Sequence, residues 1–361
     1  MRVLVAAALL AALPAACAVV KFPSRVLVAG ASGRVGTRVV RTLLERTDTT
    51  VLALSRSKES ETKIIEAISA SRPALRASKS RLEIVACDLR NERQLRTLAS
   101  SCTAAIWCAT GFTDSSSPIN KLKGLITLYF GRTVDIDGIS TLGKCMREAR
   151  PSRGAGAESD GIDVVMCSSA GVTRTQWPEA KALAFPGSAD IPIVRLNPFG
   201  ILDQKRKSED ALRATGCSYA IVRPTGLNDA WPSGRTVLSQ GDMAVGRINR
   251  DDVAELLCAL VAEPAAAGKT FEAMGLPTYP KLRSLKGVLG RLRTDAQLAP
   301  TGGTLSDAEL AVEYALLQQL LPGETGDAAA LAMGQTYEQL DTGEQGRLGA
   351  RGEEQAPLVP Q

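Results

Sequence analysis

The chain has 361 residues, with 43 Lys and Arg against 38 Asp and Glu and a formal net charge of +5. This length fits one large domain with an extension or two modest domains, and the basic residues are spread along the chain, which argues against a nucleic-acid-binding protein. The chain contains no histidine, which excludes Ser-His-Asp and Cys-His catalysis and any zinc site ligated by histidine.

The cysteines do not predict a metal site or a disulfide framework. There are eight of them, and none forms a C-x-x-C motif. Cys87, Cys108, Cys167 and Cys217 lie in or beside apolar runs typical of buried strands. We therefore expect these cysteines to be small buried hydrophobic residues, and we expect no bound metal.

The first eighteen residues have the pattern of a signal peptide. Arg2 precedes an apolar run, and Ala16-Cys17-Ala18 resembles a cleavage site. The run is too short for a membrane span and is interrupted by Pro14. Lipid attachment at Cys17 fits less well, because Leu13 stands one position too far upstream for the usual pattern.

From Ser24 onward, short β-rich apolar runs alternate with amphipathic helical stretches. This alternation predicts an α/β fold with a doubly wound parallel sheet, the Rossmann fold, with helices on both faces. Helices are expected over Gly36–Thr47 and Ser208–Gly216, the second ending on Gly216. The expected strands are Arg25–Gly30, Thr50–Arg56, Leu82–Asp88, Ala104–Thr110, Ile162–Ser169 and Ser218–Pro224.

The alternation stops after Phe271. Pro280–Arg293 is expected to form a basic amphipathic helix, and Ser306–Leu321 a second helix with an acidic start. The segment beyond Gly343 is polar and rich in turn residues, as disordered tails are. We therefore expect a helical extension with a polar tail over 276–361.

A glycine-rich turn follows the first strand and precedes a helix. In "GASGRVG", Gly30 allows the tight turn, Gly33 lets the backbone approach a pyrophosphate, and Gly36 lets helix and strand pack closely. The helix N-terminus would direct its free amides at the phosphates. This context predicts a dinucleotide-binding turn, and the alternative is a turn with a structural role alone.

The end of the second strand bears on the choice of cofactor. An acidic residue there would bind the ribose hydroxyls of NAD, whereas this chain has Ser55 and Arg56, followed by Lys58. Arg34, inside the glycine turn, can reach the same region. These positive charges favour NADP over NAD, unless Arg56 is an ordinary surface cation.

The next two strands of such a sheet would also end at the cofactor. Asp88 is placed to meet the adenine edge, and Ala109 to Gly111 would lie along the nicotinamide side. Asp88 could instead, or in addition, cap the helix that starts near Asn91.

Together with "ACDL", "VVMCSSAGV", "IVRPTGL", "INRDDVAELL" and "GKTFE", the glycine turn resembles the atypical, NmrA-like branch of the short-chain dehydrogenase/reductase superfamily. The resemblance covers about residues 25–273, and it extends to plastid NAD(P)-binding proteins of plants and algae. It implies an NAD(P)-binding Rossmann domain over 24–275. The cofactor contacts that we predict are Gly30, Ser32, Gly33, Arg34, Val35, Gly36, Ser55, Arg56, Asp88, Leu89, Ala109, Thr110, Gly111, Lys205, Arg223, Pro224 and Thr225.

Catalytic members of this superfamily use a serine after the fifth strand and a Tyr-x-x-x-Lys pair. The resemblance puts Ser169, or less well Ser168, at the serine position and Lys205 at the lysine position. The tyrosine position is then Ile201, which cannot exchange a proton with a substrate. Lys205 could still hold the nicotinamide ribose, or it could be one of several cations on a helix face.

Other polar residues could replace the missing acid. Tyr129 and Tyr219 are conceivable donors, although no spacing argument supports either. Asp251 and Asp252 could form a carboxylate pair, but an N-cap and first-turn role fits their position better.

Two functions therefore follow from the sequence. One is a non-enzymatic NADP(H)-binding protein with a redox-sensing, assembly or regulatory role, and the other is an NADPH-dependent oxidoreductase with non-standard acid/base chemistry. A partner protein or an anionic membrane surface could bind the basic segment 281–293. The signal peptide and the plastid resemblance favour a plastid reached through the secretory route, with the secretory pathway or periplasm as the alternative.

Overall fold

The computed structural model describes residues 22–110, 134–150, 161–189, 191–197, 200–277 and 279–320. The predicted signal peptide, the polar tail beyond Gly343, Gly111 and Tyr129 lie outside this described part.

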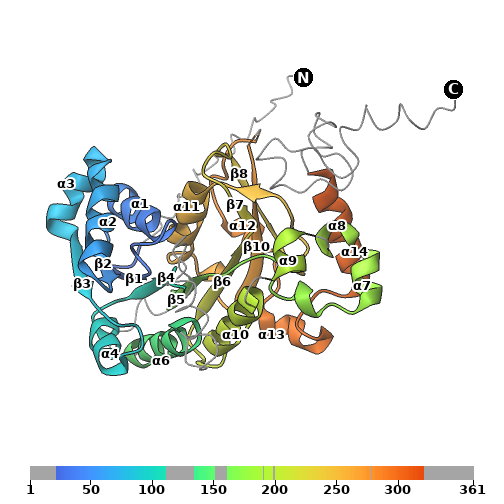
Figure 1. Ribbon diagram of the computed structural model, residues 1–361, viewed down its shortest axis with the longest axis horizontal. Helices are drawn as coiled ribbons and strands as arrows, with labels where there is room; N and C mark the ends of the chain where they lie inside the picture. The colour runs from blue at the N-terminus through green and yellow to red at the C-terminus, as the bar shows by residue number, and fades with distance from the viewer. Residues whose placement is uncertain are drawn as a thin grey trace, which may run out of the picture.

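A mostly parallel sheet forms the centre of the molecule (Figure 1). Its strand order is β3-β2-β1-β4-β5-β6-β10-β8, and β8 runs antiparallel to β10. The order reverses between β1 and β4, as it does in doubly wound sheets, whose ligands bind beyond the carboxyl ends of the strands at that point. The strands are β1 (Arg25–Ala29), β2 (Thr50–Ser55), β3 (Leu82–Ala86), β4 (Ala104–Trp107), β5 (Val164–Cys167), β6 (Tyr219–Pro224), β8 (Arg235–Ser239) and β10 (Lys269–Leu276), and a separate small sheet pairs β7 (Gly226–Leu227) with β9 (Arg247–Ile248).

Helices cover both faces of the sheet, which confirms the predicted α/β doubly wound fold. One apolar cluster joins one face to α1, α2, α3 and α11, and a second joins the other face to α4, α6 and α10. The longer helices are α1 (Gly36–Arg46), α2 (Lys58–Ser69), α3 (Arg72–Arg81), α4 (Glu92–Ser100), α6 (Ile139–Ala149), α10 (Ile201–Arg213), α11 (Arg250–Leu260) and α14 (Asp307–Gln319). The shorter ones are α7 (Glu179–Ala184), α8 (Pro186–Ala189), α9 (Pro192–Leu196), α12 (Lys286–Leu289) and α13 (Asp295–Leu298).

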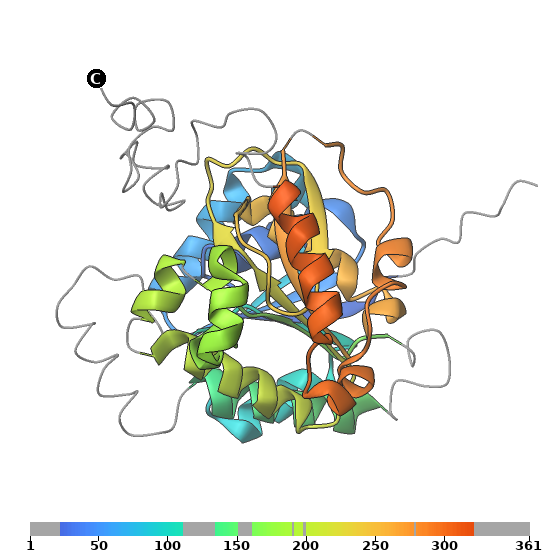
Figure 2. The same cartoon turned by 90° about the vertical axis from the view of Figure 1, so that its right-hand side faces the viewer.

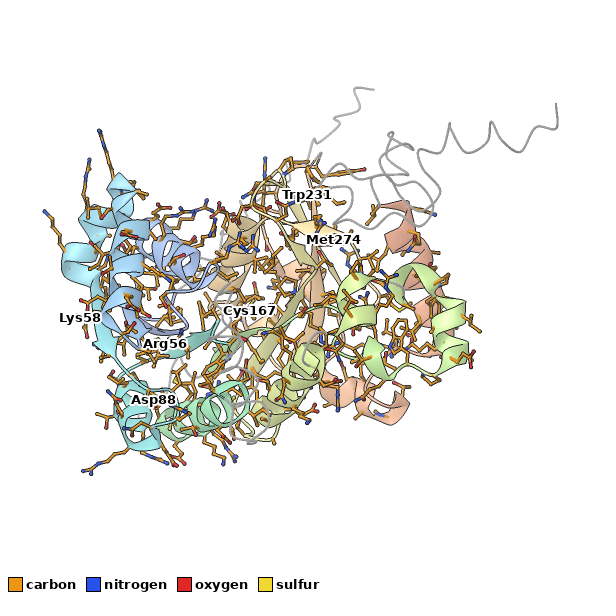
Figure 3. All side chains as sticks on the ribbon, in the orientation of Figure 1. Arg56, Lys58, Asp88, Cys167, Trp231 and Met274 are labelled. Atoms are coloured by element: carbon orange, nitrogen blue, oxygen red, sulfur yellow. The ribbon has the colours of Figure 1, made fainter. Side chains whose placement is uncertain are left out.

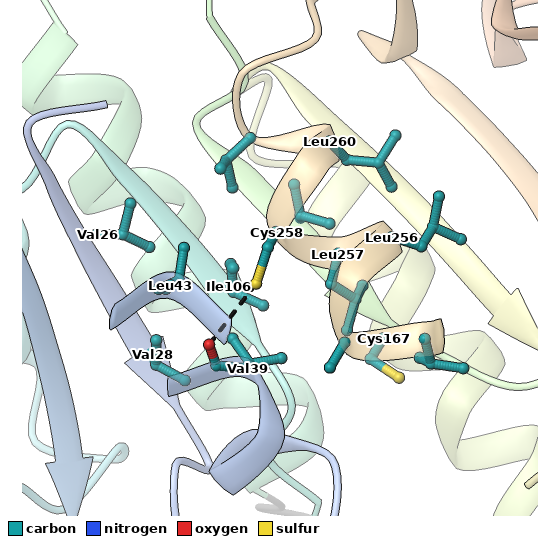
Figure 4. Packing of buried hydrophobic residues seen from close by; sticks show 14 of the residues in the cluster. Val26, Val28, Val39, Leu43, Ile106, Cys167, Leu256, Leu257, Cys258 and Leu260 are labelled. Carbon is teal, nitrogen blue, oxygen red and sulfur yellow. Dashed lines mark hydrogen bonds between the residues drawn. The ribbon is translucent and has the colours of Figure 1, made fainter. Parts of the chain in front are cut away.

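The contact between α1 and α11 shows how apolar residues fill the first of these faces (Figure 4). Val39 and Leu43 of α1 and Leu257 of α11 are fully buried. The buried Cys258 thiol donates to the Val39 carbonyl oxygen at 3.6 Å. The described cysteines are all free thiols, and most of them are buried small residues, as the sequence suggested.

The sheet extends beyond the six strands that the sequence predicts. β10 pairs in parallel with β6, and β8 closes the edge. Every residue of β10 is buried, including Lys269 and Glu272. These two charged residues interrupt the apolar run, so the hydropathy pattern does not predict a buried strand here. Helix α10 also begins earlier than expected, at Ile201.

The prediction of one basic amphipathic helix over Pro280–Arg293 is wrong. Within it the structure forms only the short helix α12, Lys286–Leu289. Gly287 and Gly290 weaken helix formation there by about 1 kcal/mol each. Lys281 is held by Asp252 and Glu255 of α11, in both cases at 2.9 Å, so part of the positive charge is neutralised by the same domain.

The predicted helix Ser306–Leu321 is present as α14 and packs on the edge of the sheet beside α7 and α8 (Figures 1 and 2). Leu310 and Leu317 join an apolar cluster with Phe185 and Met274. The Tyr314 hydroxyl accepts a hydrogen bond from the Gly187 amide at 3.1 Å. None of the helices that the structure describes is both long and apolar enough to cross a membrane.

Candidate functional site

The glycine turn between β1 and α1 brings backbone segments into close contact. Gly30 has a φ of +76°, and a Cβ there would lie 2.5 Å from the backbone nitrogen of Ala109 after β4. A Cβ on Gly36 would lie 2.1 Å from the Gly30 oxygen. Both positions therefore require glycine.

The outer side of the same turn is open. Gly33 is exposed, and the nearest atom to a Cβ there would be the Gly30 oxygen at 3.2 Å. Ser32 and Val35 are half-buried, and Val35 is the N-cap residue of α1 and makes no capping hydrogen bond with its side chain. The Thr37 amide already donates to the Gly33 carbonyl oxygen at 2.9 Å, so a pyrophosphate at this turn would have to meet the amides that precede Thr37.

Arg34 leaves this turn toward a loop that sequence reasoning did not single out. Its guanidinium Nη2 lies 2.9 Å from Oδ2 of Asp229, between β7 and β8. The Asp229 Oδ1 also forms ion pairs with Arg38 Nη2 at 3.3 Å and with Arg250 Nη1 at 2.9 Å. These hydrogen bonds and charges lower the pKa of Asp229 against the effect of its burial.

The ends of β2 and β3 lie on the same side of the molecule (Figure 3). Ser55 is buried, and its hydroxyl donates to the Ser57 carbonyl oxygen at 2.8 Å. Arg56 and Lys58 are exposed. A dinucleotide phosphate at this edge would therefore meet two cations and no carboxylate at the end of β2.

Asp88 is exposed and pairs with its own neighbour. Its carboxylate accepts from the Arg90 amide at 3.0 Å and from the Arg90 Nη2 at 2.9 Å, and these hydrogen bonds lower its pKa. The N-cap of α4 is Asn91, whose side chain accepts from the Gln94 amide. The alternative in which the Asp88 side chain caps α4 is thus wrong.

The segments after β3 and β4 each contact another part of the chain. Half-buried Leu89 lies against Gly138, where a Cβ would be 3.2 Å from the Leu89 oxygen. Ala109 is buried against the glycine turn, and Thr110 is exposed.

Lys205, in the second turn of α10, is half-buried near the ends of β4 and β5. Burial raises the pKa of the Cys108 thiol well above its usual value, and the charge of Lys205 opposes this rise. The same two causes act on Cys167. The ammonium group therefore lies close to the carboxyl ends of two adjacent strands, where a nicotinamide ribose would be expected.

The serine position of the family pattern follows β5, and the tyrosine position lies on α10 with this lysine. Ser169 is half-buried, and its hydroxyl donates to the Ala170 carbonyl oxygen at 3.0 Å. Ser168 is buried and donates to Glu209 at 2.6 Å, so it is bound within the core. Ile201, one helical turn before Lys205, has no group that can carry a proton.

A buried ion pair fixes α10 to the sheet beneath this site. The Arg223 guanidinium donates from Nε to Glu209 Oε1 at 2.9 Å and from Nη2 to Oε2 at 2.7 Å. Arg213 also donates a hydrogen bond from Nη2 to Glu209 Oε2, at 3.1 Å. Burial raises the pKa of Glu209, but Arg223, Arg213 and the Ser168 hydroxyl outweigh it and lower that pKa.

This pair changes what the Arg223 side chain can do. The guanidinium predicted to meet the cofactor is occupied by Glu209, with only 10% of its side chain exposed. Glu209 lies four residues after Lys205 on the same helix face, but sequence reasoning assigned it no partner and no role. Next to Arg223 and Pro224, buried Thr225 donates from its amide to the Ala273 oxygen at 3.0 Å.

The other conceivable acids have structural partners. Tyr219 begins β6, at the opposite end from the cofactor edge, and its hydroxyl donates to Asp295 at 2.9 Å. Burial and Asp295 raise its pKa. Its place at the start of β6, away from the carboxyl ends of the strands, argues against a role as the replacement acid. Asp251 and Asp252 both lie in the first turn of α11, which confirms the first-turn role, but the N-cap is Asn249, so the prediction that one of them is the N-cap is wrong.

Comparison with known proteins agrees with this geometry. A family model described as NAD(P)H-binding matches residues 30–264, and the chain belongs to this NAD(P)H-binding family. Protein TIC 62, chloroplastic, of Arabidopsis thaliana is 26% identical over 269 residues, which are 71% of this chain and 36% of that protein. Its namesake in Pisum sativum is 25% identical over 296 residues, 79% of this chain and 49% of that protein.

The chain thus spans half or less of the length of these curated relatives. A solved structure described as a putative NAD-dependent epimerase/dehydratase from Bacillus halodurans has 22% identity and a TM-score of 0.49, covering 74% of this chain and all of that one. The chain thus belongs to an NAD(P)H-binding family and has plastid relatives, as the resemblance of its motifs predicted.

Proposed function

We propose that this chain binds NADP(H) and serves as a redox-sensing, assembly or regulatory dinucleotide-binding protein rather than as a standard reductase. One observation carries the proposal. Lys205 lies near the ends of β4 and β5, but the residue one helical turn before it is Ile201. In this reading Lys205 would hold the ribose, and Ile201, at the tyrosine position of the family pattern, has no group that could transfer the proton.

The preference for NADP over NAD is the finer part of this proposal. Arg56 and Lys58 are exposed after β2, and a ribose 2′-phosphate would gain charge-assisted hydrogen bonds from them. The bound cofactor would supply or accept a hydride, and the residues of this chain would bind and orient it.

Titration of the purified protein with NADPH and NADH tests the binding claim, and NADPH oxidation with a panel of carbonyl and quinone acceptors tests the absence of turnover. We expect saturable binding of NADPH, weaker binding of NADH and no oxidation above background. In Ile201→Tyr, binding should be retained and carbonyl reduction should appear. Ile201→Phe is the matched control, because it adds the ring without the hydroxyl. Failure to bind either nucleotide would refute the proposal.

A second candidate is an NADPH-dependent oxidoreductase that uses another proton source. The half-buried Ser169 hydroxyl, bound only to the neighbouring Ala170 carbonyl oxygen among the contacts within the described residues, supports it. Turnover by the unmodified protein that is lost in Ser169→Ala would favour this candidate over the regulatory one.

A plastid location is also part of the proposal. The relatives named chloroplastic support it, as does the signal-peptide pattern of residues 1–18. A regulatory role further requires a protein partner that distinguishes the cofactor-bound form from the free form.

A further inference from the structure

We propose that Asp229 is a specificity-determining residue that weakens NADPH binding by holding Arg34 in an ion pair. This inference rests on the proposed function, because it assigns Arg34 to the 2′-phosphate of a bound NADP(H). In the structure, Arg34 instead contacts Asp229 through Nη2 and Oδ2 at 2.9 Å.

The carboxylate of Asp229 is held in place by its loop. Asn249, the N-cap of α11, donates from Nδ2 to the Asp229 carbonyl oxygen at 3.2 Å and to the Trp231 carbonyl oxygen at 2.6 Å. The Trp231 indole donates to the Gly275 oxygen at 3.4 Å. The loop is thereby tied to α11 and β10, so the partner that can move is Arg34.

Arg34 is also the most exposed of the arginines that share this carboxylate. Its side chain is 57% exposed, against 24% for Arg38 and 11% for Arg250. If Arg34 leaves, Asp229 keeps Arg38 at 3.3 Å and Arg250 at 2.9 Å. Release of Arg34 therefore strands no buried charge, and its cost is that of one exposed ion pair.

That cost sets the size of the effect. An exposed ion pair contributes up to about 1 kcal/mol, which corresponds to about a two- to five-fold change in a dissociation constant. Because both groups are solvent-exposed, the effect should fade as salt is raised. Asp229 would then reduce the preference for NADPH over NADH, since a cofactor without the 2′-phosphate does not need Arg34.

The test compares Asp229→Asn with Asp251→Asn in NADPH and NADH titrations at low and high salt. Asparagine keeps an oxygen that Arg38 and Arg250 can use. Asp251 is a matched control, because it is 44% exposed, lies in the first turn of α11 and pairs with Arg38 and Arg41 but not with Arg34. Both variants remove one negative charge near the turn.

We expect Asp229→Asn to tighten NADPH binding about two- to five-fold relative to Asp251→Asn at low salt, with no such difference for NADH. In the Arg34→Gln background, Asp229→Asn should have no effect. Equal changes in both aspartate variants, or equal changes for both cofactors, would overturn the inference. Arg34→Gln alone should weaken NADPH binding and leave NADH binding unchanged, and an unchanged NADPH affinity would also overturn it. Loss of all nucleotide binding by the unmodified protein would instead refute the proposed function.

Discussion

Replacing Glu209 by Gln should be strongly destabilising. The carboxylate is fully buried and accepts from Arg223 at 2.9 and 2.7 Å, from Arg213 at 3.1 Å and from Ser168 at 2.6 Å. Glutamine keeps the shape but removes the charge that balances buried Arg223. Breaking one partner of a buried ion pair costs about 3–5 kcal/mol, and we expect a loss near the lower value because the amide oxygen can still accept one bond.

Urea denaturation followed by circular dichroism would measure this loss of unfolding free energy. Asp210→Asn is the matched control. The Asp210 side chain is next to Glu209 in sequence, is 54% exposed and pairs with Arg213 at 2.9 Å, a contact expected to contribute about 0–1 kcal/mol. Because Glu209 has a lowered pKa in the folded state, its stabilisation is complete above the unfolded pKa of about 4.3 and is lost as pH falls below it. Equal losses in the two variants, or a difference that does not shrink in acid, would refute the reasoning.

Three further changes have defined outcomes. Gly36→Ala should lower the unfolding free energy measured by urea denaturation by about 1–3 kcal/mol or more, because its Cβ would meet the Gly30 oxygen at 2.1 Å. A Cβ at Gly287 would meet nothing within 4 Å, so Gly287→Ala should be neutral or stabilising in the same experiment. Arg56→Gln should weaken NADPH binding about tenfold with little change for NADH in fluorescence titrations, by loss of a charge-assisted hydrogen bond. Burial and nearby Asp242 raise the pKa of Glu272 to about 7, so its contribution to stability should fall as pH rises from about 4.5 to about 7, and Glu272→Gln should remove that slope from urea midpoints measured across this range.

The parts of the fold that depend on local pattern could be predicted from the sequence. The six predicted strands lie at the expected places, because each is a short apolar run that the sheet buries. The glycine spacing predicted the turn, and Gly30 and Gly36 have the close contacts that such a turn requires.

The parts that depend on distant partners could not be predicted. β10 was not predicted because the charged residues Lys269 and Glu272 interrupt its apolar run. Their hydrogen-bond partners are distant in sequence: Lys269 donates to the Leu289 carbonyl oxygen, and Glu272 accepts from the Ser239 hydroxyl. The basic segment 280–293 has an amphipathic pattern, but the carboxylates that pair with Lys281 belong to α11.

The candidate site shows the same division. Lys205 and Ile201 follow from the family pattern alone. The role of Arg223 could not be predicted in this way. It pairs with Glu209, fourteen residues earlier, and no spacing rule indicates that partner in preference to a cofactor. The contact between Arg34 and Asp229 joins residues 195 positions apart, which no local pattern reveals.

The most direct test of the central claim is to titrate the unmodified protein with NADPH and follow NADPH oxidation in the same samples after adding carbonyl and quinone acceptors. We expect saturable binding of NADPH, tighter than that of NADH, with oxidation no faster than in protein-free samples. Absence of binding, or oxidation that depends on the protein and saturates with acceptor, would contradict it.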